Sequence, residues 1–76
     1  MKELLKNIVE EINEFDEFDE ETDLLRDGIL DSLSLVIFEE RVEKTLNIEI
    51  PEKEVTLENF HSINTIAEML EKMNKE

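Results

Sequence analysis

A turn and a helix start are encoded at residues 23–33, which read Asp23-Leu24-Leu25-Arg26-Asp27-Gly28-Ile29-Leu30-Asp31-Ser32-Leu33. Gly28, the only glycine of the chain, follows Asp27, and this pair predicts a turn with a positive φ angle. Asp31 is a favoured N-cap residue, so Ser32 falls in the first turn of a helix, near the positive end of its dipole. An anion tethered to Ser32 would be stabilised there, although Asp27 and Asp31 oppose it. Taken alone, Asp31-Ser32 is more often a plain N-cap than a modified site.

Apolar residues recur at helical spacing on both sides of this segment. We expect a first helix over residues 2–15, a second from 31–32 to about 46–47, a short helix over about 51–55, and a last helix capped by Ser62. The stripes are Leu4, Leu5, Ile8, Val9, Ile12 and Phe15, then Leu35, Phe38, Val42 and Leu46, then Ile63, Ile66, Ala67, Leu70 and Met73. The sequence predicts one all-α domain over residues 1–76, a small four-helix bundle of three main helices and one short helix with a long first loop.

The loops carry acidic and apolar residues in separate groups. Residues 10–23 hold nine carboxylates and no cation, so mutual repulsion favours an extended, solvated start to the first loop. We expect that loop to lie on the core through Phe18, Leu24, Leu25, Ile29 and Leu30. The loop over residues 56–61 is predicted to be anchored by Leu57 and Phe60.

Composition excludes several classes of function. The 76 residues include 22 acidic and 8 basic side chains, a formal net charge of −14, which excludes nucleic-acid binding by phosphate neutralisation. A chain this short buries only roughly 60 % of its unfolded surface and has no room for a deep catalytic cavity, so we do not expect an enzyme. Without cysteine there is no disulfide, no Cys-based zinc site and no protein thiol, so any thiol chemistry needs an added group.

The first residues, MKELLKNIVEEINEF, are interrupted by charges every few positions. This pattern matches neither the apolar core of a signal peptide nor a membrane span. We therefore expect a cytoplasmic protein that is not embedded in a membrane.

The pattern Gly28-Ile29-Leu30-Asp31-Ser32-Leu33 resembles the phosphopantetheine attachment site of the acyl carrier and peptidyl carrier family, in which a loop ends in glycine and Asp-Ser-Leu opens the second helix. The similarity extends through Thr22-Asp23-Leu24-Leu25 and Ile48-Glu49-Ile50-Pro51, and so covers almost the whole chain. By this resemblance Ser32 accepts 4′-phosphopantetheine from coenzyme A, Asp31 and Leu33 are recognition residues, and Gly28 is the turn that presents them.

The resemblance also implies how such a protein works. The prosthetic group provides a flexible arm whose thiol holds an acyl or aminoacyl cargo as a thioester, while the carrier itself catalyses nothing. The implied partners are a phosphopantetheinyl transferase, an adenylating or acyl-loading enzyme, and a downstream synthase or transferase. We expect a stand-alone, monomeric carrier of an acyl or aminoacyl cargo.

Partner recognition in the family uses the second helix and the loop before it. Leu33, Val36 and Ile37 fall off the core stripe of that helix, so part of this set is expected to face outward and suit docking. Glu39, Glu40 and Glu43 are expected either to meet basic patches on partners or to be a plain solvated face.

Residues 55–63 place an aromatic-bearing loop before the last helix, where fatty-acid carriers usually have a shorter connection. This looks more like D-alanyl carriers and the stand-alone carriers of nonribosomal-peptide or polyketide pathways. His61, the only histidine, has no cysteine or second histidine to join it, so we interpret it as an ordinary loop residue and expect no metal site.

Two other classes remain open on the acidic composition. One is a small acidic helical interaction protein that works without covalent modification. The other is a weak divalent-cation module built on Asp16, Asp19, Glu20, Glu21 and Asp23, although this loop lacks the glycine and the spacing of an EF-hand.

Overall fold

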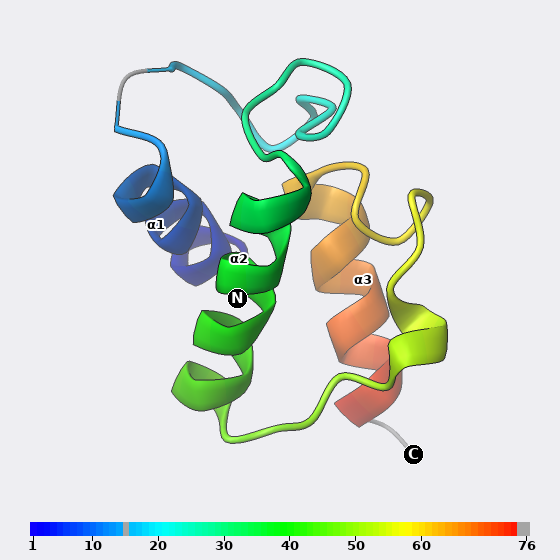
Figure 1. The fold of residues 1–76 in the computed structure, drawn as a ribbon. Helices are drawn as coiled ribbons and strands as arrows, with labels where there is room; N and C mark the ends of the chain where they lie inside the picture. Colours follow the sequence, from blue (N-terminus) through cyan, green and yellow to red (C-terminus); the bar gives the residue numbers. More distant parts are fainter. Residues whose placement is uncertain (15, 75–76) are drawn as a thin grey trace.

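Three α-helices form a bundle and a short 3₁₀-helix lies at its side (Figure 1). The structure is a computed structural model that describes residues 1–14 and 16–74, the last of them by its backbone alone. Within these ranges the elements are α1 (Lys2–Ile12), α2 (Ser32–Leu46), η1 (Glu52–Glu54) and α3 (Ile63–Asn74), and α1 packs against both α2 and α3. The predicted all-α bundle of three main helices and one short helix is confirmed.

The core lies between the apolar faces of α1, α2 and α3. Its buried hydrophobic residues are Leu5, Ile8, Val9, Leu24, Ile29, Leu30, Phe38, Val42, Ile50, Phe60, Ile63, Ile66, Ala67, Met69 and Leu70. Phe38 of α2 meets Phe60, which precedes α3, edge to face, with ring centroids 6.4 Å apart and ring planes at 88°. This aromatic pair fixes α2 against the segment that leads into α3.

Helix α1 is shorter than predicted. It ends at Ile12, so the prediction of a helix over residues 2–15 is wrong at its C-terminal end, and Phe15 lies outside the described residues. Asn13 is the C-cap, with φ −127° and ψ 90°, and its side-chain amide bonds Asp16 three residues later. Asparagine favours such local bonds over the interior of a helix, which explains why the helix stops there.

The connection between α2 and α3 also differs from the prediction. The short helix covers Glu52–Glu54 with 3₁₀ geometry, and Pro51 precedes it as its N-cap. Phe60 is 1 % exposed and anchors the next loop as predicted, but Leu57 is 76 % exposed, so its prediction as an anchor is wrong. The turn is instead held by Thr56, whose carbonyl and hydroxyl accept bonds from the backbone that follows.

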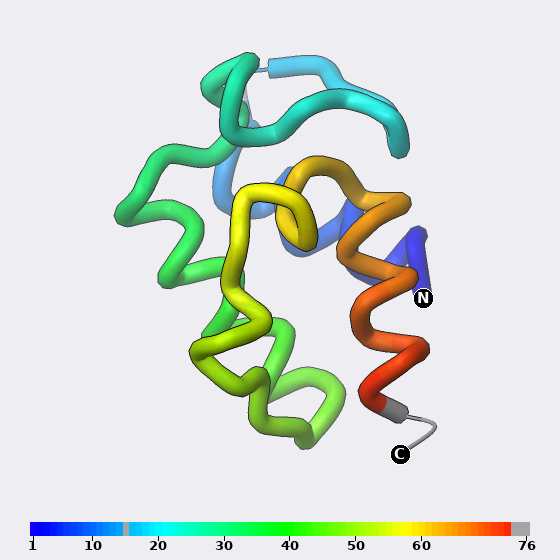
Figure 2. The backbone as a smooth tube through the Cα atoms, turned by 90° about the vertical axis from the view of Figure 1, so that its right-hand side faces the viewer, coloured from blue at the N-terminus to red at the C-terminus, as the bar shows by residue number. Residues whose placement is uncertain are grey.

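The long loop crosses the end of the bundle at which α2 and α3 begin (Figures 1 and 2). Its predicted anchors are confirmed, because Leu24, Ile29 and Leu30 are buried and Phe18 and Leu25 pack against the core. The backbone joins it to the start of α3, since the N–H of Asn64 donates to the carbonyl of Glu20 at 3.1 Å. The loop is therefore part of the folded domain.

The start of α3 is closed by a reciprocal pair of bonds between Ser62 and Thr65. The backbone N–H of Ser62 donates to the Thr65 hydroxyl at 3.0 Å, and the N–H of Thr65 donates to the Ser62 hydroxyl at 3.3 Å. The predicted capping role of Ser62 is confirmed. In the part of the chain that the structure describes, no helix has the length and apolar character needed to cross a bilayer.

Candidate functional site

Ser32 is the first residue of α2, and it is exposed. The N-cap is Asp31, with φ −105° and ψ −174°, and its carboxylate accepts a hydrogen bond from the backbone N–H of Ser34 at 2.8 Å. The carbonyl of Asp31 accepts a second bond from the N–H of Leu35 at 2.8 Å. Both bonds close the first turn of the helix, so Ser32 is presented to solvent from a rigid element.

Gly28 makes the turn that leads to this helix. Its φ angle is +73°, and nothing lies within 4 Å of the position that a Cβ would occupy. The backbone conformation, and not lack of space, therefore favours glycine here. The N–H of Gly28 donates to the carbonyl of Leu25 at 3.3 Å, which confirms the turn expected from the sequence.

The segment before Ser32 is tied to both neighbouring parts of the bundle. On the α3 side, the N–H of Leu24 donates to the carbonyl of His61 at 2.8 Å, and the N–H of Leu30 donates to the carbonyl of Leu24 at 2.9 Å. On the α1 side, the side-chain amide of Asn13 donates to the carbonyl of Ile29 at 3.0 Å. These bonds fix the path by which the chain enters α2.

His61 lies beside Asp23 in the same region. The Nε2 atom of His61 is 3.3 Å from a carboxylate oxygen of Asp23, whose other oxygen accepts a bond from the N–H of Arg26 at 3.0 Å. The pair joins the long loop to the residues before α3. His61 is an exposed loop residue, as interpreted from the sequence, and the structure adds its contact with Asp23.

The electrostatics around Ser32 favour an ionised N-cap. The hydrogen bond from the backbone N–H of Ser34 is the largest cause that holds the pKa of the Asp31 carboxyl below its usual value. The positive end of the α2 dipole lies at the same turn. The exposed Ser32 hydroxyl and this helix start fit the attachment of 4′-phosphopantetheine through a phosphodiester, since an anion at a helix N-terminus is stabilised by its backbone amides.

An apolar surface follows Ser32 along α2. Leu33, Val36 and Ile37 are 71 %, 50 % and 38 % exposed, and we call them the α2 apolar surface. Phe38 and Val42 of the same helix are buried. The expectation that part of this set faces outward is met by all three residues.

The three glutamates proposed for docking have different surroundings. Glu40 is exposed, whereas Glu43 accepts a hydrogen bond from the backbone N–H of Ile50 at 2.8 Å and so holds the chain that leaves α2. Burial raises the pKa of Glu39, and the neighbouring Glu43 and Glu40 raise it further. Glu43 thus has a structural contact, whereas Glu39 is half-buried and Glu40 is exposed to solvent.

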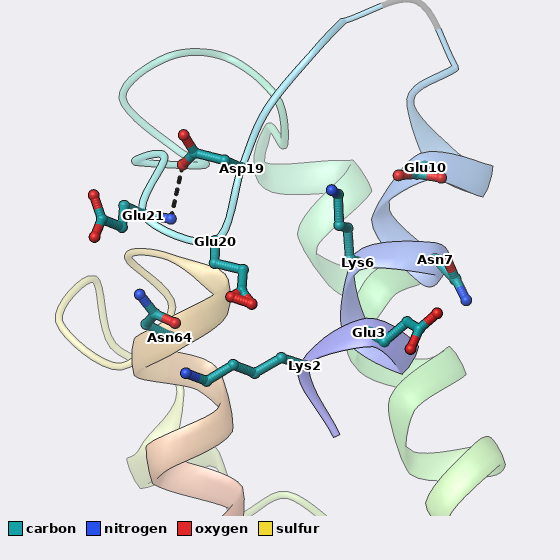
Figure 3. Close-up of a pocket in the computed structure, with 9 residues that line it drawn as sticks. All are labelled: Lys2, Glu3, Lys6, Asn7, Glu10, Asp19, Glu20, Glu21 and Asn64. Carbon is teal, nitrogen blue, oxygen red and sulfur yellow. Dashed lines mark hydrogen bonds between the residues drawn. The ribbon is translucent and has the colours of Figure 1, made fainter.

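A hollow of about 760 Å³ lies between α1, the long loop and the start of α3 (Figure 3). Lys2, Lys6 and Asn64 line it together with acidic residues, and Asp19 uses its carboxylate to accept a bond from the N–H of Glu21. Over residues 1–14 and 16–74, no three or more His, Asp or Glu side chains are arranged to hold a metal ion. The hollow is lined by residues of α1, the long loop and the start of α3 and does not include Ser32.

The structure brings Gly28, Asp31, Ser32 and Leu33 together as one turn and helix start. Sequence reasoning missed the contribution of Asn13, because its partner, the carbonyl of Ile29, is 16 residues away. The only signal was the asparagine itself, a residue type that is typical of a helix end.

Comparison with known proteins shows similarity to carrier proteins over almost the whole chain. The family described as "Phosphopantetheine attachment site" matches residues 3–70. The D-alanyl carrier protein of Lactococcus lactis subsp. cremoris (strain MG1363) is 33 % identical over 78 residues, which cover 100 % of this chain and 99 % of the relative. The D-alanyl carrier protein of Lactococcus lactis subsp. lactis (strain IL1403) is 32 % identical over the same extents.

Proposed function

This chain belongs to the phosphopantetheine-binding carrier protein family, and on that premise we propose that Ser32 is the residue to which 4′-phosphopantetheine is attached. Proteins of this family carry a prosthetic group and are not catalysts. When bound, the group supplies a terminal thiol that holds the cargo as a thioester. The protein supplies the attachment point and the surfaces that partners recognise.

The observation that carries the proposal is the placement of Ser32 at the exposed start of α2, directly after the N-cap Asp31. The sequence has two other serines. Ser34 is half-buried in the first turn of α2, and Ser62 is buried with its hydroxyl bonded to the backbone N–H of Thr65. Ser32 is therefore the most exposed of the three serines, which favours its access to a transferase.

The attachment reaction makes few demands on the carrier. The Ser32 Oγ forms an O–P bond to the phosphorus atom that bears pantetheine, the pyrophosphate link of coenzyme A breaks, and adenosine 3′,5′-bisphosphate leaves. The hydroxyl proton goes to a base of the transferase. The carrier contributes a fixed Oγ at a helix start, where the negative charge of the product is stabilised.

Family membership implies two kinds of partner, a phosphopantetheinyl transferase and a loading enzyme. In our proposal the loading enzyme is an adenylating or acyl-transferring enzyme, and a downstream synthase or transferase takes the cargo. In this proposal the partner enzymes dock on the α2 apolar surface, and Glu39 and Glu40 of the same helix bind basic side chains of the partner. We propose a monomer that acts in the cytoplasm.

For the cargo, we propose an aminoacyl group of the D-alanyl kind. The support is the similarity to D-alanyl carrier proteins, which extends over 100 % of this chain. The test is to load the phosphopantetheinylated protein with an adenylating enzyme, ATP and D-alanine, and to follow the intact mass. Loading with D-alanine but not with L-alanine or medium-chain acyl donors supports the proposal. Loading with an acyl donor alone contradicts it.

Attachment itself is tested by intact-mass measurement after incubation with coenzyme A and a broad-specificity phosphopantetheinyl transferase. We expect the wild type and Ser34→Ala to gain the mass of one phosphopantetheine, and Ser32→Ala to gain none. Unchanged addition in Ser32→Ala overturns the site assignment. An acidic interaction protein or a cation-binding module gains no mass in any variant, so the same experiment separates these alternatives.

A further inference from the structure

We propose that Asn13 is a positioning residue for the attachment reaction, because its side-chain amide fixes the peptide group that leads the chain into α2. The inference rests on the proposed attachment at Ser32. Asn13 acts at a distance, through the backbone between Ile29 and Leu30.

The backbone of Asn13 is itself held by α1. It is the C-cap of the helix, and its N–H donates to the carbonyl of Val9 at 2.8 Å. The side chain therefore projects from a fixed point. It spans from the end of α1 to the segment immediately before Ser32.

The orientation of the amide follows from its partners. Nδ2 of Asn13 donates to the carboxylate of Asp16 at 2.9 Å and to the carbonyl of Ile29 at 3.0 Å. Oδ1 of Asn13 accepts from the backbone N–H of Asp16 at 3.3 Å. A reversed amide would place its oxygen against two acceptor oxygens, so the nitrogen must face Ile29.

The bond to Ile29 completes the pinning of one peptide plane. The carbonyl of Ile29 and the N–H of Leu30 belong to the same planar group. Asn13 binds the carbonyl from the α1 side, and the carbonyl of Leu24 accepts the N–H at 2.9 Å. Because both ends of the plane are bonded, it cannot rotate without losing a hydrogen bond.

The orientation of this plane sets the direction in which the chain enters α2. Ile29 and Leu30 are buried, so their side chains fix the position of the segment, and the two bonds fix its rotation. Asp31 and Ser32 follow directly. Without the Asn13 amide, the plane is held on one side only, and the Ser32 Oγ spends less time in the geometry that in-line attack requires.

The test compares Asn13→Ala and Asn13→Asp with the matched control Asn7→Ala. Asn7 is an exposed asparagine inside α1, six residues before Asn13 in the sequence. Asn13→Asp keeps the shape of the side chain but replaces the donor Nδ2 with an acceptor oxygen, which then faces the Asp16 carboxylate and the Ile29 carbonyl. Two quantities are measured, the hydrogen exchange of single backbone amides by NMR and the steady-state kcat and KM of a phosphopantetheinyl transferase at saturating coenzyme A.

We expect the Leu30 amide to exchange about fivefold faster in both Asn13 variants, as for the loss of one hydrogen bond, and the Ile66 amide within α3 to stay unchanged. We expect kcat to fall about three- to tenfold with KM unchanged, because the docking surface is intact while the nucleophile is misplaced. Asn7→Ala should behave as the wild type in both measurements.

Two results would overturn the inference, and a third would refute the proposed function on which it rests. Equal kcat and equal Leu30 exchange in wild type and Asn13→Ala contradict it directly. A fall in kcat with equally faster exchange at Leu30 and Ile66 shows general destabilisation instead of positioning. A wild type that is not modified at Ser32 refutes the proposed function, while the exchange at Leu30 still reports whether Asn13 holds the segment.

Discussion

The carboxylate of Asp31 lies 2.8 Å from the backbone nitrogen of Ser34, and this hydrogen bond closes the first turn of α2 over Ser32. The Asp31 side chain is therefore bonded to the backbone of the first helical turn. The Ser32 side chain is left on the exposed side of the same turn. One residue thus caps the helix, and the next is free to carry a group.

The N-cap should make stability depend on pH below the usual pKa of an aspartate. The pKa of the Asp31 carboxyl is lowered, mainly by the hydrogen bond from the backbone N–H of Ser34. The contribution of the ionised carboxylate to the free energy of unfolding is therefore present above pH 3.8, and it is lost as the pH falls through the lowered pKa. Asparagine is an equally common N-cap but does not titrate. We expect wild type to be more stable than Asp31→Asn at pH 7, with the gap closing in acid, in urea unfolding. A gap that is constant from pH 7 to pH 2 contradicts this account.

Glu39 should behave in the opposite way. The pKa of Glu39 is raised by burial, then by Glu43 and Glu40, so the protonated form is the one that stabilises the fold. Its contribution to stability is present below pH 4.5 and is lost as the pH rises through the raised pKa. Glu39→Gln removes an i,i+4 repulsion with Glu43, which is worth about 0.2–0.5 kcal/mol. We expect this variant to be more stable than wild type at pH 7 and equal to it near pH 4. A less stable variant at pH 7 would show that the Glu39 charge has a favourable partner.

Gly28 should tolerate asparagine better than alanine. Its φ of +73° is strained for residues with a Cβ, and asparagine is the residue that enters this region most readily, as Asn47 does with φ 54°. We expect Gly28→Ala to lower the free energy of unfolding by about 1 kcal/mol and Gly28→Asn by less. A loss in Gly28→Asn that equals or exceeds the loss in Gly28→Ala would contradict the argument that the φ angle decides this position.

The helix pattern and the attachment motif were readable from the sequence because they are local. The spacing of Phe38 and Val42 predicted the buried face of α2, and the Gly28 turn and the Asp31 cap follow from residues a few positions apart. The predicted burial of Leu57 failed because apolar character alone does not show which of two neighbours, Leu57 or Phe60, reaches the core.

Contacts between residues that are distant in the sequence could not be predicted from local patterns. The side-chain amide of Asn13 also donates to the carbonyl of Ile29, and this bond joins residues that are 16 positions apart. The pairing of His61 with Asp23 likewise requires the long loop to return to the start of α3. For Glu43, the sequence offered docking or solvent, and the structure adds a bond to the backbone of Ile50.

Docking on the α2 apolar surface should be separable from the chemistry at Ser32. Val36→Asp places a charge on that surface, and Leu57→Asp places the same charge on an equally apolar but different exposed site. We expect Val36→Asp to raise the KM of the transferase about tenfold, as for the loss of roughly 1.4 kcal/mol, with kcat unchanged. Leu57→Asp should leave both constants unchanged. Equal effects of the two variants would show that added charge, and not this surface, is responsible.

The most direct test of the account is to locate the added group within the wild-type chain. Trypsin cleaves after Arg26 and Arg41, which releases a peptide of residues 27–41 that contains Ser32 and Ser34. After treatment with coenzyme A and a phosphopantetheinyl transferase, fragment-ion mass spectrometry of this peptide distinguishes the two serines. The account predicts the phosphopantetheine mass on Ser32 alone. The group on Ser34, on another peptide, or on none would contradict it.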